Sequence, residues 1–360
     1  MSGCAPKLEC MLTDLLDHEL LLVRRGARSG AYTIIAVHST ALGPALGGCR
    51  LTTYAHPGDA VADALRLAEG MTLKAAVAGV ELGGGKGVVC VEPGTPLTAE
   101  TRKAMLLDFG DAVESLGGRY ITAEDVGTSP ADMRLIATRT EHLVGLPEDL
   151  GGLGDPSPFT ALGVHAAMRG CAEHRFGTPD LAGRSVAVIG VGHVGEALAR
   201  MLAAEGANVI VSDVDERKRA LAAELEGASW MSPDEALRAR VDVLAPCALG
   251  GVLDETTVPQ LEAGIVCGAA NNQLAHDALA EDLTRRGIDY APDFVANAGG
   301  LMRVAAELEG ADGEGAQART AAIEDLMRRI MREAASLGVT PLAAAHAIAE
   351  RRLSGPLATV

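Results

Sequence analysis

The sequence comprises 360 residues and is 48% hydrophobic but only 2% aromatic, which predicts about two domains whose cores consist of small and medium aliphatic side chains and excludes disorder as the main state. A formal net charge of −17 argues against nucleic acid and anionic membranes as partners. The chain contains no run of about 18 apolar residues, so we expect no membrane span. The acidic N-terminal stretch lacks the basic start of a signal peptide, and we expect a cytoplasmic protein.

The cysteines are odd in number and include no CxxC pair. Several lie in apolar runs, so we expect buried free thiols in a reducing compartment rather than disulfides. No His/Cys cluster has the spacing of a metal site, so no metal is expected. The seven cysteines are at positions 4, 10, 49, 90, 171, 247 and 267.

The first part of the chain alternates strand and helix patterns, which predicts an α/β domain. Two β-branched runs and a third short strand are separated by Ala-rich or Leu-rich segments with apolar residues at helical spacing. In chain order, the predictions are a strand over 31–39, a helix over 58–79, a strand over 87–93, a helix over 98–117, and a strand over 119–122 leading into a loop over 123–130.

A stretch dense in Gly and Pro, residues 145–158, predicts a linker and hinge. The segments after it predict a doubly wound parallel sheet, with two helices in the tail over 315–352. Its expected elements are strands over 184–190, 208–213, 241–247 and 264–270 and a helix over 193–206. We therefore expect two α/β domains, one over 1–145 plus 328–360 and the other over 146–327, with a cleft between them.

The segment VAVIGVGHVG carries Gly190, Gly192 and Gly195 in the GxGxxG spacing, directly after a strand and at the start of a helix. In that context the glycines permit a tight turn and bring backbone close to a pyrophosphate at the helix N-terminus. Asp213, at the end of the next strand, is placed to bind a ribose hydroxyl and to repel a 2′-phosphate. These residues predict NAD as cofactor, although Arg217 lies nearby; the alternative is a glycine turn without a ligand.

A second glycine-rich stretch, VELGGGKGVV at 80–89, lacks the spacing and the hydroxyl of a phosphate loop. It surrounds Lys86 with glycines, twelve residues after Lys74, and Asp125 follows in a glycine-bearing loop. Scattered surface charge is the alternative for all three, above all for Lys74, whose long stem can lie along an apolar surface. Burial and a nearby lysine lower the pKa of an amine, so Lys86 is a candidate general base.

Eight stretches match the sequence pattern of a known family. They occur in the order of that pattern, are spread over most of the chain, and together are highly specific for the family. They are GPALGGCR (43–50), GMTLKAAVAG (70–79), LGGGKG (82–87), TAEDVGTSPADM (122–133), GDPSPFTALGV (154–164), APCALGG (245–251), GAANNQL (268–274) and APDFVANAGG (291–300). With them the sequence resembles the amino acid dehydrogenases that act on Glu, Leu, Phe and Val, and it is most similar to the leucine and valine enzymes. Two departures are Ala75, where many members carry Asn, and Arg303, often Asn in leucine enzymes.

The resemblance implies that the domain over 1–145 plus 328–360 binds substrate and forms the oligomer and that the domain over 146–327 binds NAD. It also implies a role for each matched residue. Lys74 resembles the lysine that holds the substrate α-carboxylate, Lys86 the lysine that activates water, and Asp125 the acid that exchanges protons with the amine. Substrate-backbone positions are Gly47 and Asn297. Cofactor positions, besides the three glycines and Asp213, are His193, Val194, Thr160, Cys247, Ala248 and Asn271.

The resemblance also implies an apolar side-chain pocket. Leu46 stands where glutamate enzymes carry a lysine, Leu301 and Val304 match further pocket positions, and Ala123 is small. The implied reaction is the reversible NAD-dependent oxidative deamination of Leu, Val or Ile by a homo-oligomer, a dimer or an octamer. A phenylalanine enzyme and a catalytically silent nucleotide-binding subunit remain alternatives, and single pocket residues could instead be plain core.

Overall fold

A computed structural model describes residues 17–147, 149, 154–248 and 250–355. The cysteines at 4 and 10, most of the N-terminal stretch and part of the expected linker (148 and 150–153) lie outside these residues. The chain forms two compact units, unit 1 with residues 1–155 and 350–360 and unit 2 with residues 156–349. These limits differ from those expected from the sequence, because the helix over 323–337 buries Met327, Ile330 and Met331 and contacts the first helix of unit 2.

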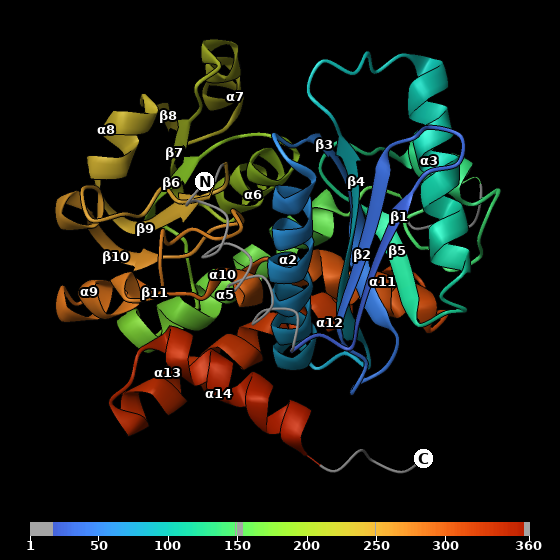
Figure 1. The fold of residues 1–360 in the computed structure, drawn as a ribbon. Coiled ribbons are helices and arrows are strands. Elements are labelled where there is room, and N and C mark those ends of the chain that lie inside the picture. The colour runs from blue at the N-terminus through green and yellow to red at the C-terminus, as the bar shows by residue number, and fades with distance from the viewer. Residues whose placement is uncertain (1–16, 148, 150–153, 249, 356–360) are drawn as a thin grey trace, which may run out of the picture. The chain divides into compact units, whose positions relative to one another are not determined.

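Unit 1 contains a mixed five-stranded sheet in the order β1-β2-β4-β3-β5 (Figure 1). Its strands are β1 (Leu20–Arg25), β2 (Tyr32–Ser39), β3 (Ala45–Thr53), β4 (Gly83–Val91) and β5 (Tyr120–Glu124). Strand β4 is parallel to β3, and β3 to β5, whereas β2 runs antiparallel to both β1 and β4. The carboxyl ends of β3 and β5 therefore lie at one edge of the sheet.

Helices cover both faces of this sheet, as the alternating side chains of β2 and β4 require (Figure 1). Ile34, Ala36, Val88 and Cys90 pack with the alanines of α2 (Pro57–Ala78) on one face. The residues between them in sequence pack with α3 (Ala99–Glu114) on the other face. Helix α4 (Pro130–Ile136) follows β5. The predicted strands and the two long predicted helices of unit 1 are confirmed, with ends shifted by a few residues.

Unit 2 contains a six-stranded, wholly parallel sheet in the order β11-β10-β9-β6-β7-β8. Numbered within the unit and read from β8 to β11, this is the order 3-2-1-4-5-6 of the dinucleotide-binding fold. The strands are β6 (Ser185–Ile189), β7 (Asn208–Ser212), β8 (Ser229–Trp230), β9 (Arg240–Pro246), β10 (Glu262–Val266) and β11 (Asp289–Tyr290). The doubly wound parallel sheet predicted from the sequence is confirmed.

The helices after the linker belong to unit 2, except that the last of them, α14, extends past residue 349, where unit 2 ends. They are α5 (Ser157–Phe176), α6 (His193–Ala204), α7 (Arg219–Glu224), α8 (Pro233–Arg238), α9 (Leu279–Arg285), α10 (Asp293–Ala296), α11 (Gly299–Leu308), α12 (Gly313–Ala321), α13 (Ile323–Leu337) and α14 (Pro341–Ser354). Two short 3₁₀ turns cover Glu216–Lys218 and Val258–Gln260. The prediction of two tail helices was wrong, because a turn at residue 322 separates α12 from α13 and leaves α14 as a third.

No helix in the described part of the chain has the length and apolar character needed to cross a membrane. Five cysteines are described, and all of them are free: Cys49, Cys90, Cys171, Cys247 and Cys267. All but Cys247 are buried, as the sequence predicts.

Candidate active site

Lys86 lies in the middle of β4, not in a loop, because the strand begins at Gly83 and takes in the whole glycine run. A Cβ on Gly84 would lie 2.1 Å from the Thr72 amide nitrogen, and one on Gly85 would lie 2.8 Å from the Tyr120 ring. The glycines therefore let α2 and Tyr120 press directly onto the strand. Lys86 has the same parity as Gly84, so its side chain extends on the α2 face, and the residue is only 6% exposed.

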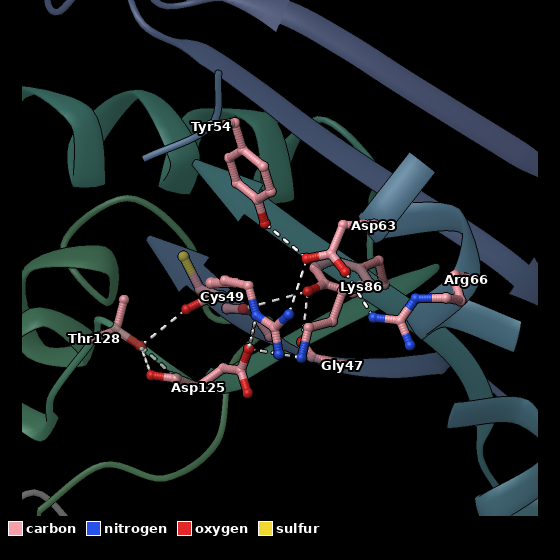
Figure 2. Close-up of polar contacts among 11 residues, drawn as sticks. Gly47, Cys49, Tyr54, Asp63, Arg66, Lys86, Asp125 and Thr128 are labelled. Carbon is pink, nitrogen blue, oxygen red and sulfur yellow. Dashed lines mark hydrogen bonds and ion pairs between the residues drawn. The ribbon is translucent and has the colours of Figure 1, made fainter. Parts of the chain in front are cut away.

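Asp125 is the first residue after β5, in a turn that brings it to Lys86. The Thr128 amide donates to the Asp125 carbonyl, and Gly127 adopts a positive φ of 82° that suits glycine. The Thr128 hydroxyl lies 3.0 Å from the Asp125 amide, which donates to it. The Lys86 Nζ and the Asp125 Oδ2 atoms are 2.8 Å apart, so the two predicted acid–base residues, buried Lys86 and half-buried Asp125, form an ion pair (Figure 2).

Arg50, which the sequence analysis did not single out, is a third member of this cluster. It lies on β3, and its Nε donates to the Asp125 Oδ2 at 3.0 Å. Its Nη1 donates at 2.8 Å to the Oδ2 of Asp63 on α2. The same Asp63 oxygen accepts from the Tyr54 hydroxyl at 2.7 Å (Figure 2). The only sequence signal for Arg50 was its place at the end of the GPALGGCR stretch.

The surroundings shift the protonation of the pair in a direction useful for base catalysis. Burial lowers the pKa of Lys86, the Asp125 carboxylate opposes this, and the Arg50 guanidinium adds to the lowering. Burial disfavours the charged form of Asp125, but the Lys86 ammonium and the Arg50 guanidinium outweigh it and leave the pKa of Asp125 below its ordinary value. An amine that gives up its proton readily therefore lies beside a carboxylate that stays charged.

The other predicted residues of unit 1 lie on the same elements. Lys74 is half-buried on α2, five residues before that helix ends at Gly79. A Cβ on Gly47 would lie 1.7 Å from the Gly85 carbonyl, so only glycine permits this approach of β3 to β4. Leu46 is 3% exposed on β3, and Ala123, half-buried on β5, pairs with Gly48.

In unit 2 the predicted dinucleotide turn joins β6 to α6 at the carboxyl edge of the sheet. Gly190 has a φ of 95°, and Gly192 is the N-cap of α6, which begins with His193 and Val194. A Cβ on Gly195 would lie 1.9 Å from the Gly190 carbonyl, whereas one on Gly192 would meet no atom within 4 Å. The turn therefore closes on itself at Gly195 and stays open at Gly192, as a cradle for a pyrophosphate requires.

Asp213 follows β7 and faces this turn. Its Oδ2 accepts from the Val191 amide at 2.8 Å, and its Oδ1 accepts from the Asp215 amide at 2.9 Å. The nearby Arg217 is 90% exposed, and its Nη2 lies 2.8 Å from the Asp215 Oδ2. Asp213 thus lies where the sequence places it, and Arg217 is paired with a different carboxylate.

The remaining predicted cofactor residues gather around the same edge of the sheet. A Cβ on Gly190 would lie 2.5 Å from the Ala248 Cβ, and one on Gly195 would lie 3.3 Å from the Cys247 Cβ, so the loop after β9 packs on the turn. Thr160 lies in the first turn of α5, and its hydroxyl donates to the Pro156 carbonyl at 3.2 Å.

Asn297 and Asn271, predicted for substrate and cofactor respectively, contact each other. The Asn297 Nδ2 donates to the Asn271 Oδ1 at 2.8 Å and to the Ala269 carbonyl at 3.1 Å. Asn297 is 6% exposed, and its Oδ1 is a buried atom without a hydrogen-bond partner among the described residues. A buried acceptor of this kind is costly unless a donor reaches it.

The predicted pocket residues Leu301 and Val304 are buried on α11, at 7% and 8% exposure. Between them, Arg303 is 1% exposed, 3.6 Å from the Glu307 Oε2 and 6.0 Å from the centre of the Phe159 ring. No group of three or more His, Cys, Asp or Glu residues in the described ranges is arranged to hold a metal ion.

Comparison with protein families gives three matches. The dimerisation-domain model of the Glu/Leu/Phe/Val dehydrogenases matches residues 23–142, and the glutamate/leucine/phenylalanine/valine dehydrogenase model matches residues 210–348. The model of the NAD-binding domain of D-isomer specific 2-hydroxyacid dehydrogenases matches residues 163–249.

Individual relatives extend over nearly the whole chain. The sequence is 47% identical to a valine dehydrogenase of Streptomyces albus, over 95% of this chain and 94% of that protein. It is 42% identical to a leucine dehydrogenase of Bacillus cereus, over 94% of this chain and 91% of that protein. The crystal structure of L-tryptophan dehydrogenase from Nostoc punctiforme is similar with a TM-score of 0.83 and 39% identity, covering 96% of this chain and 98% of that one.

Proposed function

The chain belongs to the Glu/Leu/Phe/Val dehydrogenase family and is an amino acid dehydrogenase with a nicotinamide cofactor, and we propose that it deaminates branched-chain L-amino acids with NAD. The balanced reaction takes the amino acid, water and NAD⁺ to the 2-oxo acid, ammonium, NADH and a proton. The observation that carries the proposal is the ion pair of Lys86 and Asp125, 2.8 Å apart.

The proposed chemistry needs a base that releases its proton easily and an acid that serves the amine. Lys86, whose pKa burial lowers, takes a proton from the water that attacks the imine carbon of the oxidised substrate. Asp125 then exchanges protons with the amine nitrogen, which leaves as ammonia. Lys74 holds the α-carboxylate as a fixed cation, and the buried Oδ1 of Asn297 accepts a hydrogen bond from the substrate amine.

The residues of unit 2 fit a dinucleotide. Gly192 leaves open space at the N-terminus of α6 for a pyrophosphate, and Asp213 faces the ribose position. When bound, the nicotinamide accepts the hydride from the substrate α-carbon. NAD is proposed over NADP because Asp213 would repel a 2′-phosphate and Arg217 is paired with Asp215.

Leu46 supports an aliphatic substrate. It is an apolar residue, 3% exposed, so a glutamate side chain beside it would bury a carboxylate without a cation. The valine and leucine dehydrogenases among the relatives support the same choice. Ala123, Leu301 and Val304 are the further residues that we propose for recognition of the aliphatic side chain, and phenylalanine is the alternative substrate.

We further propose a cytoplasmic homo-oligomer. The dimerisation-domain model covers most of unit 1, and β1 lies at an edge of its sheet with an exposed end. Free, buried thiols are what a reducing compartment preserves.

The proposal is tested with purified protein, NAD and a panel of L-amino acids, with NADH formation followed at about 340 nm and ammonia assayed separately. We expect turnover with Leu, Val and Ile, and the reverse reaction with their 2-oxo acids and ammonia. Best turnover with phenylalanine would replace the substrate proposal, and no turnover with any amino acid would refute the activity.

A further inference from the structure

Arg50 links the acid–base pair to α2 through two carboxylates. Its Nε lies 3.0 Å from the Asp125 Oδ2, and its Nη1 lies 2.8 Å from the Asp63 Oδ2. The side chain of Arg50 is 21% exposed, and those of Asp125 and Asp63 are 21% and 17% exposed. These ion pairs are therefore partly desolvated. In such an environment the electrostatic interaction between two charges is stronger than it is at the fully exposed surface.

Both cations use the same carboxylate oxygen. Lys86 Nζ and Arg50 Nε bind the Asp125 Oδ2 at 2.8 and 3.0 Å. We propose that Arg50 is a positioning residue that fixes Asp125 through Oδ2, beside Lys86, and so leaves Oδ1 to exchange protons with the substrate amine. This inference rests on the proposed function of the Lys86–Asp125 pair.

Arg50 is itself held in place, which a positioning residue requires. Asp63 receives the Tyr54 hydroxyl on the same oxygen as Arg50, and its other oxygen accepts from Arg66 at 2.8 Å. The planar guanidinium binds two carboxylates in fixed directions, which a lysine ammonium does not do. A substitution by lysine therefore keeps the charge and loses the geometry.

Arg50 also affects the protonation of Lys86 and Asp125, because its positive charge lowers the pKa of both residues. The charged groups that act on Lys86 include Asp125 after β5, Arg50 on β3 and Asp63 on α2. The Cys49 thiol, next to Arg50 in the chain, packs on the α3 face of the sheet instead. Burial raises the pKa of Cys49, so the thiol stays neutral. With Arg50 present, Asp125 keeps a cationic partner when Lys86 loses its proton. Without it, the pair would hold its shared proton more tightly.

The test compares Arg50→Gln and Arg50→Lys with the control Arg28→Gln. Arg28 likewise bridges two carboxylates in unit 1, those of Asp108 and Asp111 on α3, which covers the face of the sheet opposite to α2. In Arg50→Gln we expect the limb of kcat/KM that rises with pH to move upward by about one pH unit, since a positive neighbour of Lys86 is lost. Arg28→Gln is expected to lower stability and leave that limb in place.

Arg50→Lys provides the second readout, and it applies even if Arg50→Gln fails to fold. The pH limb should stay near that of the native protein, while kcat falls about tenfold to a hundredfold with little change in KM for the amino acid, because Asp125 is misplaced. Full kcat in Arg50→Lys, or an unmoved limb in folded Arg50→Gln, would overturn the proposal.

A titration without turnover keeps this inference distinguishable from the proposed function. The chain contains only five lysines, Lys7, Lys74, Lys86, Lys103 and Lys218, so ¹⁵N-lysine labelling yields a short set of ammonium signals. The Lys86 signal is assigned by its loss in Lys86→Arg. An upward shift of its titration in Arg50→Gln supports the coupling whether or not any amino acid is oxidised, and an unchanged titration contradicts it.

Discussion

The Asp213 carboxylate accepts a hydrogen bond at 2.8 Å from the Val191 amide, in the middle of the glycine-rich turn. The residue expected to choose the cofactor therefore also braces the backbone that would hold the pyrophosphate. Charge and geometry at this position can be separated by substitution, because an asparagine oxygen can still accept from Val191 whereas a serine is too short.

The first prediction concerns this choice. The native protein should use NAD with a higher kcat/KM than NADP, because Asp213 repels a 2′-phosphate. Asp213→Asn should lower the ratio of kcat/KM for NAD to kcat/KM for NADP, while the affinity for NAD stays close to native. Asp213→Ser should lower the same ratio and also weaken the binding of both cofactors. Measuring kcat/KM for both cofactors in the three proteins decides the matter; equal or better use of NADP by the native protein would refute it.

The second prediction concerns Lys86. Lys86→Ala should lower kcat by about two to four decades, the usual share of general acid–base catalysis, with the far-UV circular dichroism unchanged. In the native protein kcat/KM should rise with pH through the lowered pKa of Lys86, because the neutral amine is the active base. The steady-state rate over a range of pH measures both effects, and near-normal turnover in Lys86→Ala would remove Lys86 from the mechanism.

The third prediction concerns Lys74. Lys74→Ala should mainly raise KM for the amino acid, because a cation that holds the α-carboxylate in ground and transition states contributes to binding. The KM for NAD, measured at saturating amino acid, serves as the internal control. A loss confined to kcat, with KM for the amino acid unchanged, would assign Lys74 to the chemical step instead.

The fourth prediction concerns the substrate side chain. Leucine, isoleucine and valine should exceed glutamate in kcat/KM, since a buried carboxylate beside Leu46 would lack a partner. Discrimination against phenylalanine should be weaker than discrimination against glutamate, because methylene-scale differences in an apolar pocket are worth only about 1–3 kcal/mol. Competition assays with these amino acids give the ratios, and a preference for glutamate would show that Leu46 does not line the pocket.

The fifth prediction concerns the glycine strand. Gly84→Ala should destabilise the protein by about 1–3 kcal/mol or more, because the new methyl group would overlap the Thr72 amide nitrogen and the Ala68 carbonyl. Gly70→Ala, on α2 with no atom within 4 Å of the added methyl, should instead stabilise by up to about 1 kcal/mol. Thermal melts of the two variants test the contrast, and equal melting temperatures would contradict it.

Local patterns predicted the elements that they encode directly. The β-branched runs became β2, β6 and β7, and the GxGxxG turn lies between a strand and a helix as expected. The start of β4 was missed because glycine has low strand propensity, and its place in the sheet depends on Thr72 and Tyr120, which are distant in sequence. The role of Arg50 was missed because it depends on contacts distant in sequence: its two partners are 13 and 75 residues away.

The glycines that flank Lys86 in β4 have a consequence for directed evolution. Close contacts with the β3 backbone and with the rings of Tyr120 and Phe109 set the position of Lys86, so repacking of aliphatic residues elsewhere in unit 1 should disturb it little. Libraries that randomise Leu46 and Ala123 can therefore explore new substrates with the ammonium group still in register. Libraries that include residues 83–87 would consist mostly of proteins that do not fold, so the randomised positions are better chosen outside that strand.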